Sequence, residues 1–317
     1  MISFIVIGRN EGEKLKRCFE SIFITIKHNK FTEYEIIYVD SKSTDNSIVI
    51  AQSYKKVKIF LITGFCNAAI GRNIGAKESK GSILFFIDGD MEIEKDFLSN
   101  VLDKNMNLNY DFVSGQVVDI VEDIPDKLRY SLKDTANIKI TQAALGGIFI
   151  IKREIWEAAN GMRTKFTTGE ESDLGYRLIK MGFSFTYKNH IISKHYTYQN
   201  TDLSIISKAI FSKAAFYPRC IFYRNHILNK YMYFGMWKLD KTFVVLIISI
   251  FLMLIFPDIW PIFILTYVIA VFLRTIKQSK KSIFKYILYY LMFDILNIIY
   301  FFTFFPENKS LKYQKVY

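Results

Sequence analysis

Apolar stretches of strand length alternate with segments of helical spacing through the first half of this 317-residue chain. The stretches with the character of strands are Ile2–Ile7, Tyr34–Asp40, Val57–Thr63, Ile83–Asp88, Phe112–Val118 and Leu145–Ile151. The segments with helical spacing are Glu13–Ile26, Thr44–Tyr54 and Asn67–Ser79. Apolar runs separated by helices are typical of parallel strands that are buried on both faces. The pattern therefore predicts an α/β fold with a doubly wound, mainly parallel sheet.

Polar side chains follow the expected strands at the ends where an α/β sheet binds its ligands. Asn10 and Glu11 come after the first strand, Asp40 ends the second, and Asp88 and Asp90 end the fourth. Two carboxylates two residues apart suit a Mg²⁺ or Mn²⁺ ion that also carries substrate phosphates. An acidic turn that merely caps a strand is the alternative for this pair.

Two common phosphate-binding motifs are missing from the sequence. No Gly-x-Gly-x-x-Gly follows the first strand, and no Gly-Lys-Ser/Thr occurs, so dinucleotide and P-loop sites are excluded. The charge of a nucleotide diphosphate would then be balanced by a metal held by Asp90, with Arg72 nearby.

The last part of the chain carries long apolar runs. Phe243–Phe256 and Ile259–Leu273 contain no charge, and Ile283–Phe305 contains only Lys285 and Asp294. As helices the first two runs would each measure roughly 21 to 23 Å, less than the roughly 30 Å of a hydrocarbon core. We expect a membrane hairpin over 243–273, and a segment over 283–305 that either spans the membrane or lies at its interface. A soluble helical core is the alternative.

Charge predicts the orientation in the membrane. No charged n-region with a cleavage site precedes Met1–Gly8, which has the character of a strand entering a turn, so the N-terminal domain should stay in the cytoplasm. Basic residues follow the second apolar run and favour the cytoplasmic side: Arg274, Lys277, Lys280, Lys281 and Lys285. The tail also carries Lys309, Lys312 and Lys315, although a single crossing by 283–305 would place it outside. We expect the cytoplasmic (inner) membrane.

The net charge of +12 includes a segment in which Lys and Arg alternate with aromatic residues. Such a segment fits an anionic lipid surface better than nucleic acid, because it leads into apolar helices. The expected organisation is a catalytic domain over 1–200, a juxtamembrane amphipathic segment over 201–240, membrane helices over 241–305 and a basic tail over 306–317. Cys18, Cys66 and Cys220 show no metal or redox spacing and are expected to be reduced thiols.

Several short motifs occur in a fixed order on these expected elements: Ser3-Phe4-Ile5-Val6-Ile7-Gly8-Arg9-Asn10-Glu11, Val39-Asp40-Ser41-Lys42-Ser43-Thr44-Asp45, Gly71-Arg72-Asn73-Ile74-Gly75-Ala76, Asp88-Gly89-Asp90, and a block from Gly146-Gly147 through Asn160-Gly161-Met162 to Gly169-Glu170-Glu171-Ser172-Asp173-Leu174. In their order and spacing they resemble the GT-A glycosyltransferases of family two. The resemblance covers residues 1 to about 200 and implies a Rossmann-like GT-A fold that binds a nucleotide-diphospho-sugar, linked to UDP or GDP.

The resemblance also implies roles for single residues. Asp40 would contact the base or ribose, Asp88 the ribose or a metal-bound water, and Asp90 the metal on the diphosphate. Arg72 would support the phosphates, and His195 would complete the metal site. Asn10, Glu11 and Gly147 are further substrate-binding candidates. Two alternatives stay open: Asp40 as a strand-end turn residue, and Arg72 as the partner of a surface acid.

An inverting transfer needs a base that takes the proton of the acceptor hydroxyl. The resemblance implies that this base lies in Glu170-Glu171, where the family usually has Glu-Asp, so that Glu171 aligns with the base. Asp173 is expected to pair with Arg177 four residues later.

The leading hypothesis is a membrane-associated, metal-dependent inverting glycosyltransferase of the hexosyltransferase type. Its acceptor would be a lipid-linked glycan or a polyprenyl phosphate in envelope polysaccharide or glycolipid synthesis. A noncatalytic nucleotide-binding membrane scaffold is one alternative. A processive polysaccharide synthase is the other, although the apolar runs are short and no Gln-x-x-Arg-Trp block is present.

Overall fold

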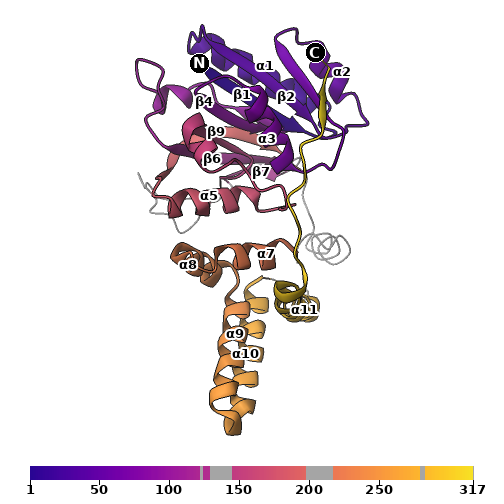
Figure 1. Cartoon of the computed structure of the whole chain (residues 1–317), viewed down its shortest axis with the longest axis vertical. Coiled ribbons are helices and arrows are strands. Elements are labelled where there is room, and N and C mark those ends of the chain that lie inside the picture. Colours follow the sequence, from indigo (N-terminus) through magenta and orange to yellow (C-terminus); the bar gives the residue numbers. More distant parts are fainter. Residues whose placement is uncertain (122–123, 129–144, 198–216, 279–282, 317) are drawn as a thin grey trace. The chain divides into compact units, whose positions relative to one another are not determined.

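The structure, a computed structural model, describes residues 1–121, 124–128, 145–197, 217–278 and 283–316 (Figure 1). It divides into two compact units. The sheet unit comprises residues 1–200 and 307–317, and the helical unit comprises residues 201–306. Residues 201–216 of the expected juxtamembrane segment lie outside the described residues.

Parallel strands form the centre of the sheet unit. β1 (Ile2–Gly8), β2 (Tyr34–Asp40), β3 (Val57–Ile62) and β4 (Ile83–Asp88) pair in the order β3-β2-β1-β4. Beyond β4 the order continues through β8 (Ile148–Lys152), β6 (Phe112–Val121), β9 (Phe185–Tyr196) and β5 (Met91–Ile93), while β7 (Ile124–Leu128) pairs with β6. The predicted α/β fold with a mainly parallel core is therefore confirmed.

Helices cover both faces of this parallel centre (Figure 1). α1 (Glu13–His28) buries Leu15, Phe19 and Ile22 in one core, together with Phe4 and Val6 of β1. α3 (Ala68–Glu78) buries Ile70 and Ile74 in a second core on the other face, against Ile7. Alternate residues of β1 thus serve different cores, which is why its sequence is apolar throughout.

α3 approaches β1 unusually closely. A Cβ atom on Gly75 would lie 2.2 Å from Cγ2 of Ile5, and one on Gly71 would lie 3.1 Å from Cγ2 of Ile7. A side chain at Gly75 would therefore force a neighbour to shift, and one at Gly71 would be tightly packed. The close approach sets the position of Arg72, which lies between the two glycines in the sequence.

Shorter elements complete the sheet unit: α2 (Ser47–Gln52), a 3₁₀ turn at Leu98–Asn100, α4 (Arg153–Ala158) and α5 (Glu170–Lys180). α2 is shorter than the helix expected over Thr44–Tyr54, because the residues before it form a loop tied to Asn10 and Asp40. β9 is long because it pairs with β6 on one side and with β5 on the other.

The end of the chain returns to the sheet unit. β10 (Tyr313–Lys315) pairs antiparallel with β3, where Gln314 lies opposite Leu61. The Tyr313 hydroxyl donates to Glu78 Oε1 at 2.6 Å, and the Lys309 amide donates to Thr164 Oγ1 at 2.7 Å. The sequence analysis described these residues only as a basic tail and did not predict this strand.

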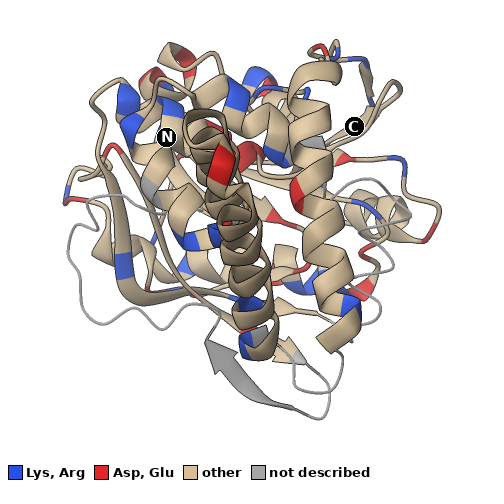
Figure 2. Cartoon of the chain, turned by 90° about the horizontal axis from the view of Figure 1, so that it is seen from below, with Lys and Arg blue, Asp and Glu red and all other residues tan. Residues whose placement is uncertain are grey.

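The helical unit consists of α7 (Tyr217–His226), α8 (Lys230–Leu239), α9 (Lys241–Ile255), a 3₁₀ turn at Pro257–Ile259, α10 (Trp260–Gln278) and α11 (Ile283–Thr303). Pro257–Lys277 and Ile283–Thr303 are long and apolar enough to cross a membrane, by length and composition alone. Charged residues are sparse along the long helices that face the viewer in Figure 2. α9 is apolar too but shorter.

Candidate active site

The carboxyl ends of β1, β2 and β4 lie side by side. Gly8 of β1 is opposite Asp40 of β2, and Ile7 is opposite Asp88 of β4. This register brings the polar residues that follow the strands to one edge of the sheet, as the parallel arrangement predicts.

Asp40 and Asn10 hold the loop that follows β2. The carboxylate of Asp40 accepts a hydrogen bond from the Ser43 amide at 2.8 Å and one from the Tyr38 hydroxyl at 2.9 Å. Asn10 accepts from the Thr44 amide at 2.7 Å, and its own amide donates to Ser43 Oγ at 2.9 Å. Both residues therefore shape a loop at the edge of the sheet where a ligand would lie.

His195 stands between two carboxylates that come from neighbouring strands. Its Nε2 atom lies 3.1 Å from Asp90 Oδ2, and its Nδ1 atom lies 2.7 Å from Asp119 Oδ1. In the sheet, His195 on β9 is opposite Met91 on β5 and Asp119 on β6. The predicted pair Asp90 and His195 is thus brought together, and Asp119 is a third member that the sequence analysis missed.

This arrangement fits a bound cation. A neutral imidazole donates from one nitrogen only, and the shorter contact favours Nδ1–H donating to Asp119. The lone pair of Nε2 and the carboxylate of Asp90 then converge as two acceptors. Among the described residues no group of three or more His, Cys, Asp and Glu is arranged to hold a metal. The pair instead suits Mg²⁺ or Mn²⁺, which takes its other ligands from phosphate and water.

Negative charge is concentrated at the same edge. Burial together with the nearby charges of Asp90 and Asp88 raises the pKa of Glu11 to about 7, although Lys14 opposes the shift. Glu11 also donates its backbone amide to Ser47 Oγ at 3.0 Å. A carboxyl group with such neighbours is stabilised in its charged form when a cation is present.

Arg72 connects this edge to the start of α5. Its Nη2 donates to Asp88 Oδ1 at 2.8 Å, and its Nη1 lies 3.0 Å from Glu170 Oε1 and 3.1 Å from Glu171 Oε1. The Arg72 side chain is only 1% exposed, and its Nε atom is buried without a partner among the described residues. The structure surrounds Arg72 with carboxylates, and its expected support of phosphates stays a prediction.

Gly147 leaves space for Asp88. A Cβ atom at position 147 would lie 1.9 Å from Asp88 Oδ2, and the Asp88 amide donates to the Gly147 carbonyl at 3.1 Å. This glycine, expected among the substrate-binding residues, therefore sets where the Asp88 carboxylate can lie. Burial, Asp90 and Glu171 raise the pKa of Asp88 to about 6, and Arg72 opposes them.

The two glutamates open α5. Gly169 has φ of 78°, a left-handed conformation that suits glycine, and it directs Glu170 and Glu171 into the first turn. Carboxylates are stabilised there by the positive end of the helix. The Glu170 side chain is 6% exposed and that of Glu171 is 19% exposed. Burial and the charge of Glu171 raise the pKa of Glu170, while Arg72 lowers it.

Other polar contacts fix α5 and the loop before it. Asp173 accepts from Arg177 at 2.9 Å, as expected from their spacing, and from Arg163 at 3.2 Å. Asn73 on α3 donates to the Met162 carbonyl at 2.7 Å and accepts from the Met162 amide at 2.9 Å. α3 thus binds both the loop and, through Arg72, the glutamates. The sequence signal for Asn73 was its place in the Gly71-Arg72-Asn73 motif.

Comparison with known proteins identifies the family to which this chain is similar. The model of the family described as "Glycosyl transferase family 2" matches residues 3–168. The chain is 24% identical over 302 residues to a protein of Methanococcus voltae, covering 89% of this chain and 88% of the relative. That relative is named dolichyl N-acetyl-alpha-D-glucosaminyl phosphate 3-beta-D-2,3-diacetamido-2,3-dideoxy-beta-D-glucuronosyltransferase.

Two staphylococcal proteins are similar over shorter parts. Poly(ribitol-phosphate) beta-N-acetylglucosaminyltransferase TarP of Staphylococcus aureus (strain N315) is 32% identical over 119 residues, and the match covers 36% of this chain and 36% of TarP. The crystal structure of S. aureus TarS 1-349 superimposes with a TM-score of 0.54 at 15% identity, covering 76% of this chain and 73% of that one. The superposition supports the GT-A fold.

Proposed function

This chain belongs to glycosyl transferase family 2, and we propose that it moves a sugar from a nucleotide-diphosphate donor to a lipid-linked acceptor at a membrane, with inversion at the anomeric carbon. The observation that supports this most strongly is the set of contacts made by Arg72. One guanidinium holds Asp88, which lies on the donor side by the resemblance, and Glu170 and Glu171, which lie on the acceptor side.

Glu171 is the base in this proposal. It is the more exposed of the two glutamates, and it lies in the first turn of α5. Its carboxylate takes the proton of the acceptor hydroxyl as the hydroxyl oxygen forms a bond to the anomeric carbon and the bond to the nucleotide diphosphate breaks. A single displacement of this kind inverts the anomeric configuration. Glu170, more buried and bonded to Arg72, holds its neighbour in place.

Asp90 and His195 would hold a Mg²⁺ or Mn²⁺ ion, and Asp119 would orient the His195 ring. Such an ion, when bound, neutralises the negative charge that develops on the departing diphosphate. The protein side of this site is supported by two observations: the convergence of Asp90 and His195 Nε2, and the raised pKa of Glu11 beside Asp90. Asp40 and Asn10 shape the loop that would face the nucleotide.

The helical unit supports a lipid-linked acceptor. Within the most apolar stretch of each candidate span, only 17% of residues in Pro257–Lys277 and 28% in Ile283–Thr303 are buried. Helices in the core of a soluble protein are mostly buried, so these apolar surfaces fit lipid better. The name of the Methanococcus relative contains the words dolichyl N-acetyl-alpha-D-glucosaminyl phosphate, a lipid-linked sugar. We extend this to a polyprenyl phosphate or lipid-linked glycan here, reached from the cytoplasmic face of the inner membrane.

Donor turnover tests the proposal. Detergent-solubilised protein would be incubated with UDP- and GDP-sugars and Mn²⁺ or Mg²⁺, and released nucleotide would be measured with and without total membrane lipid. Asp90→Ala is compared with Asp96→Ala, a nearby exposed carboxylate, as the matched control. We expect lipid-stimulated release by wild type and by Asp96→Ala only. No metal-dependent release from any donor would favour a noncatalytic nucleotide-binding scaffold.

A further inference from the structure

α11 is long enough to cross a membrane, since its 21 residues would measure about 31 Å. Its contacts nevertheless place it across one end of the hairpin formed by α9, the turn at Pro257–Ile259 and α10. We call that end the hairpin base and define it by Leu239, Asp240, Thr242 and Arg274.

Ion pairs and hydrogen bonds hold the helices together at the hairpin base. The carboxylate of Asp240, only 2% exposed, accepts hydrogen bonds from Arg219 and Tyr223 of α7. Arg274 near the end of α10 donates to Thr242 Oγ1 at 2.7 Å and to the Leu239 carbonyl at 2.8 Å. α7 and both arms of the hairpin therefore meet at Asp240.

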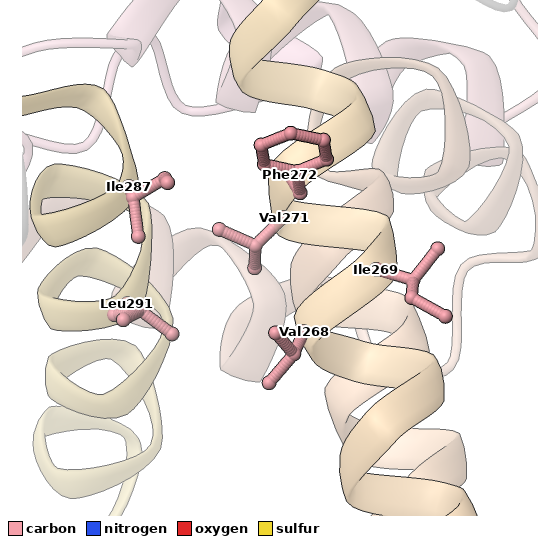
Figure 3. Close-up of a pocket in the computed structure, with 6 residues that line it drawn as sticks. All are labelled: Val268, Ile269, Val271, Phe272, Ile287 and Leu291. Carbon is pink, nitrogen blue, oxygen red and sulfur yellow. The ribbon is translucent and has the colours of Figure 1, made fainter. Parts of the chain in front are cut away.

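The first half of α11 lies against this base. The Arg274 guanidinium stacks over the Tyr290 ring at 4.1 Å, and the Arg219 guanidinium stacks over the Phe293 ring at 4.9 Å. Contacts with α10 run from the middle of that helix toward the base: Tyr267 donates to Asp294 Oδ2 at 3.1 Å, and Val271 joins the same apolar cluster. An apolar hollow of about 210 Å³ lies between the same parts of α10 and α11 (Figure 3).

The last turn of α11 also lies near the base. Arg224 of α7 donates to the Phe301 carbonyl at 2.7 Å and to the Phe304 carbonyl at 2.6 Å, and it stacks over the Phe305 ring at 3.9 Å. α7 is about 15 Å long and also carries Arg219, which binds Asp240. The hairpin tip at Asp258, in contrast, lies beyond the 15 residues of α9, which separate it from Asp240 by about 22 Å of helix.

The chain on either side of α11 favours one compartment. Directly after α11 it returns to the sheet unit, where β10 pairs with β3. Basic residues lie near both ends of α11: Lys277 before it and Lys285 in its first turn, and Lys309, Lys312 and Lys315 after it. Lys and Arg near apolar helices favour the cytoplasmic side, so both flanks prefer the compartment of the sheet unit.

We propose that α11 lies along the membrane surface without crossing it and that the hairpin alone enters the bilayer. The chain then enters and leaves the membrane on the side of the sheet unit. This rests on the proposed membrane attachment. One face of α11 exposes Phe284, Leu288, Ile295, Ile299 and Phe302 to lipid, while Asp294 and Asn297 are buried on the other face. A surface position keeps Asp294 away from the bilayer centre, where a carboxylate is costly.

Cysteine labelling tests this topology. Cys66→Ser, which leaves only the buried Cys18 and Cys220, is the background. Single cysteines are introduced at two exposed positions, Lys285→Cys in the first turn of α11 and Ser310→Cys in the segment that follows α11 and belongs to the sheet unit. Lys55→Cys, exposed on the sheet unit, marks the catalytic side. A membrane-impermeant maleimide is applied to intact spheroplasts and to inverted vesicles of expressing bacteria, and nucleotide release verifies that each variant is folded.

We expect Lys285→Cys and Ser310→Cys to be labelled only in inverted vesicles, like Lys55→Cys. Labelling of the two positions from opposite sides would overturn the surface position of α11 and leave the proposed transfer reaction intact. Recovery of the protein in the soluble fraction would overturn both the membrane attachment and the position of α11.

Discussion

The guanidinium of Arg72 lies 2.8 Å from the carboxylate of Asp88 beneath the carboxyl end of β4, and the same guanidinium contacts Glu170 and Glu171. Arg72 is buried, so its charge and those of its partners depend on one another. Arg72 therefore ties the carboxyl end of β4 to the first turn of α5. Changes at Arg72 should affect stability as well as catalysis.

Arg72→Met should lower the free energy of unfolding by about 3 to 5 kcal/mol, because it leaves three carboxylates without their buried partner. Arg72→Lys keeps the positive charge but lacks the planar set of N–H donors of the guanidinium. It should therefore recover only part of the lost free energy of unfolding. Urea unfolding followed by intrinsic fluorescence measures both. Lys16→Met, at an exposed position of α1, is the control and should stay within about 0.5 kcal/mol of wild type. An Arg72→Met protein as stable as this control would contradict the role given to Arg72.

The sequence located Arg72 in a motif but did not show its partners. Glu170 is 98 residues away, and only the packing of α3 and α5 in the folded chain brings the two together. Local patterns predicted the strands β1 to β4 well, because their apolar runs are continuous and are bounded by polar residues. The burial of Arg72 depends instead on long-range contacts, which one sequence does not reveal.

Gly147→Ala should lower kcat/KM by about 100-fold, since the added Cβ would lie 1.9 Å from Asp88 Oδ2 and must displace that carboxylate. Nucleotide release at varied donor concentration measures the change. A thermal unfolding curve recorded beside it separates local displacement from loss of the fold. Activity within a few-fold of wild type would show that Asp88 does not need its present position.

Asp119→Ala should weaken Mn²⁺ binding by about 10- to 100-fold, because Asp119 fixes the ring of His195. Titration of the protein with Mn²⁺, followed by the electron paramagnetic resonance signal of the free ion, gives the affinity without substrate. Asp96→Ala serves as the control carboxylate. Unchanged Mn²⁺ affinity in Asp119→Ala would exclude this positioning role.

Asp119 and β10 show what else the sequence could not reveal. Asp119 lies in the apolar run of β6 with no motif around it, and it meets His195 only because β6 and β9 are neighbours in the sheet. β10 has three residues, two of them polar or charged, and its strand conformation depends on the edge of β3. Both features follow from strand order, which propensity and periodicity do not specify.

Glu170→Gln should change the dependence of stability on pH. The pKa of Glu170 is raised by burial and by Glu171, so the protonated form is favoured in the folded state. The stability that protonated Glu170 contributes is fully present below pH 4.5, the ordinary pKa of a glutamate. It is lost as the pH rises through the higher pKa of the folded state. Gln resembles the protonated acid at every pH. Above pH 4.5 the free energy of unfolding of the variant should therefore exceed that of wild type. The difference should approach about 1.4 kcal/mol for each unit by which folding raises the pKa of Glu170.

Unfolding curves of the two proteins across this range measure the effect, with Glu157→Gln at an exposed position as the control. A Glu170→Gln protein that loses stability relative to wild type as the pH rises would mean that the charged form is the favoured one.

The most direct test of the central claim is the rate of sugar transfer to extracted membrane lipid by Glu171→Gln, compared with Glu170→Gln and wild type, using the donor that gives nucleotide release. If Glu171 takes the acceptor proton, Glu171→Gln should lower kcat by about 10²- to 10⁴-fold while the KM for the donor stays within a few-fold, and Glu170→Gln should lose less. Transfer by Glu171→Gln at a rate close to that of wild type would contradict the account.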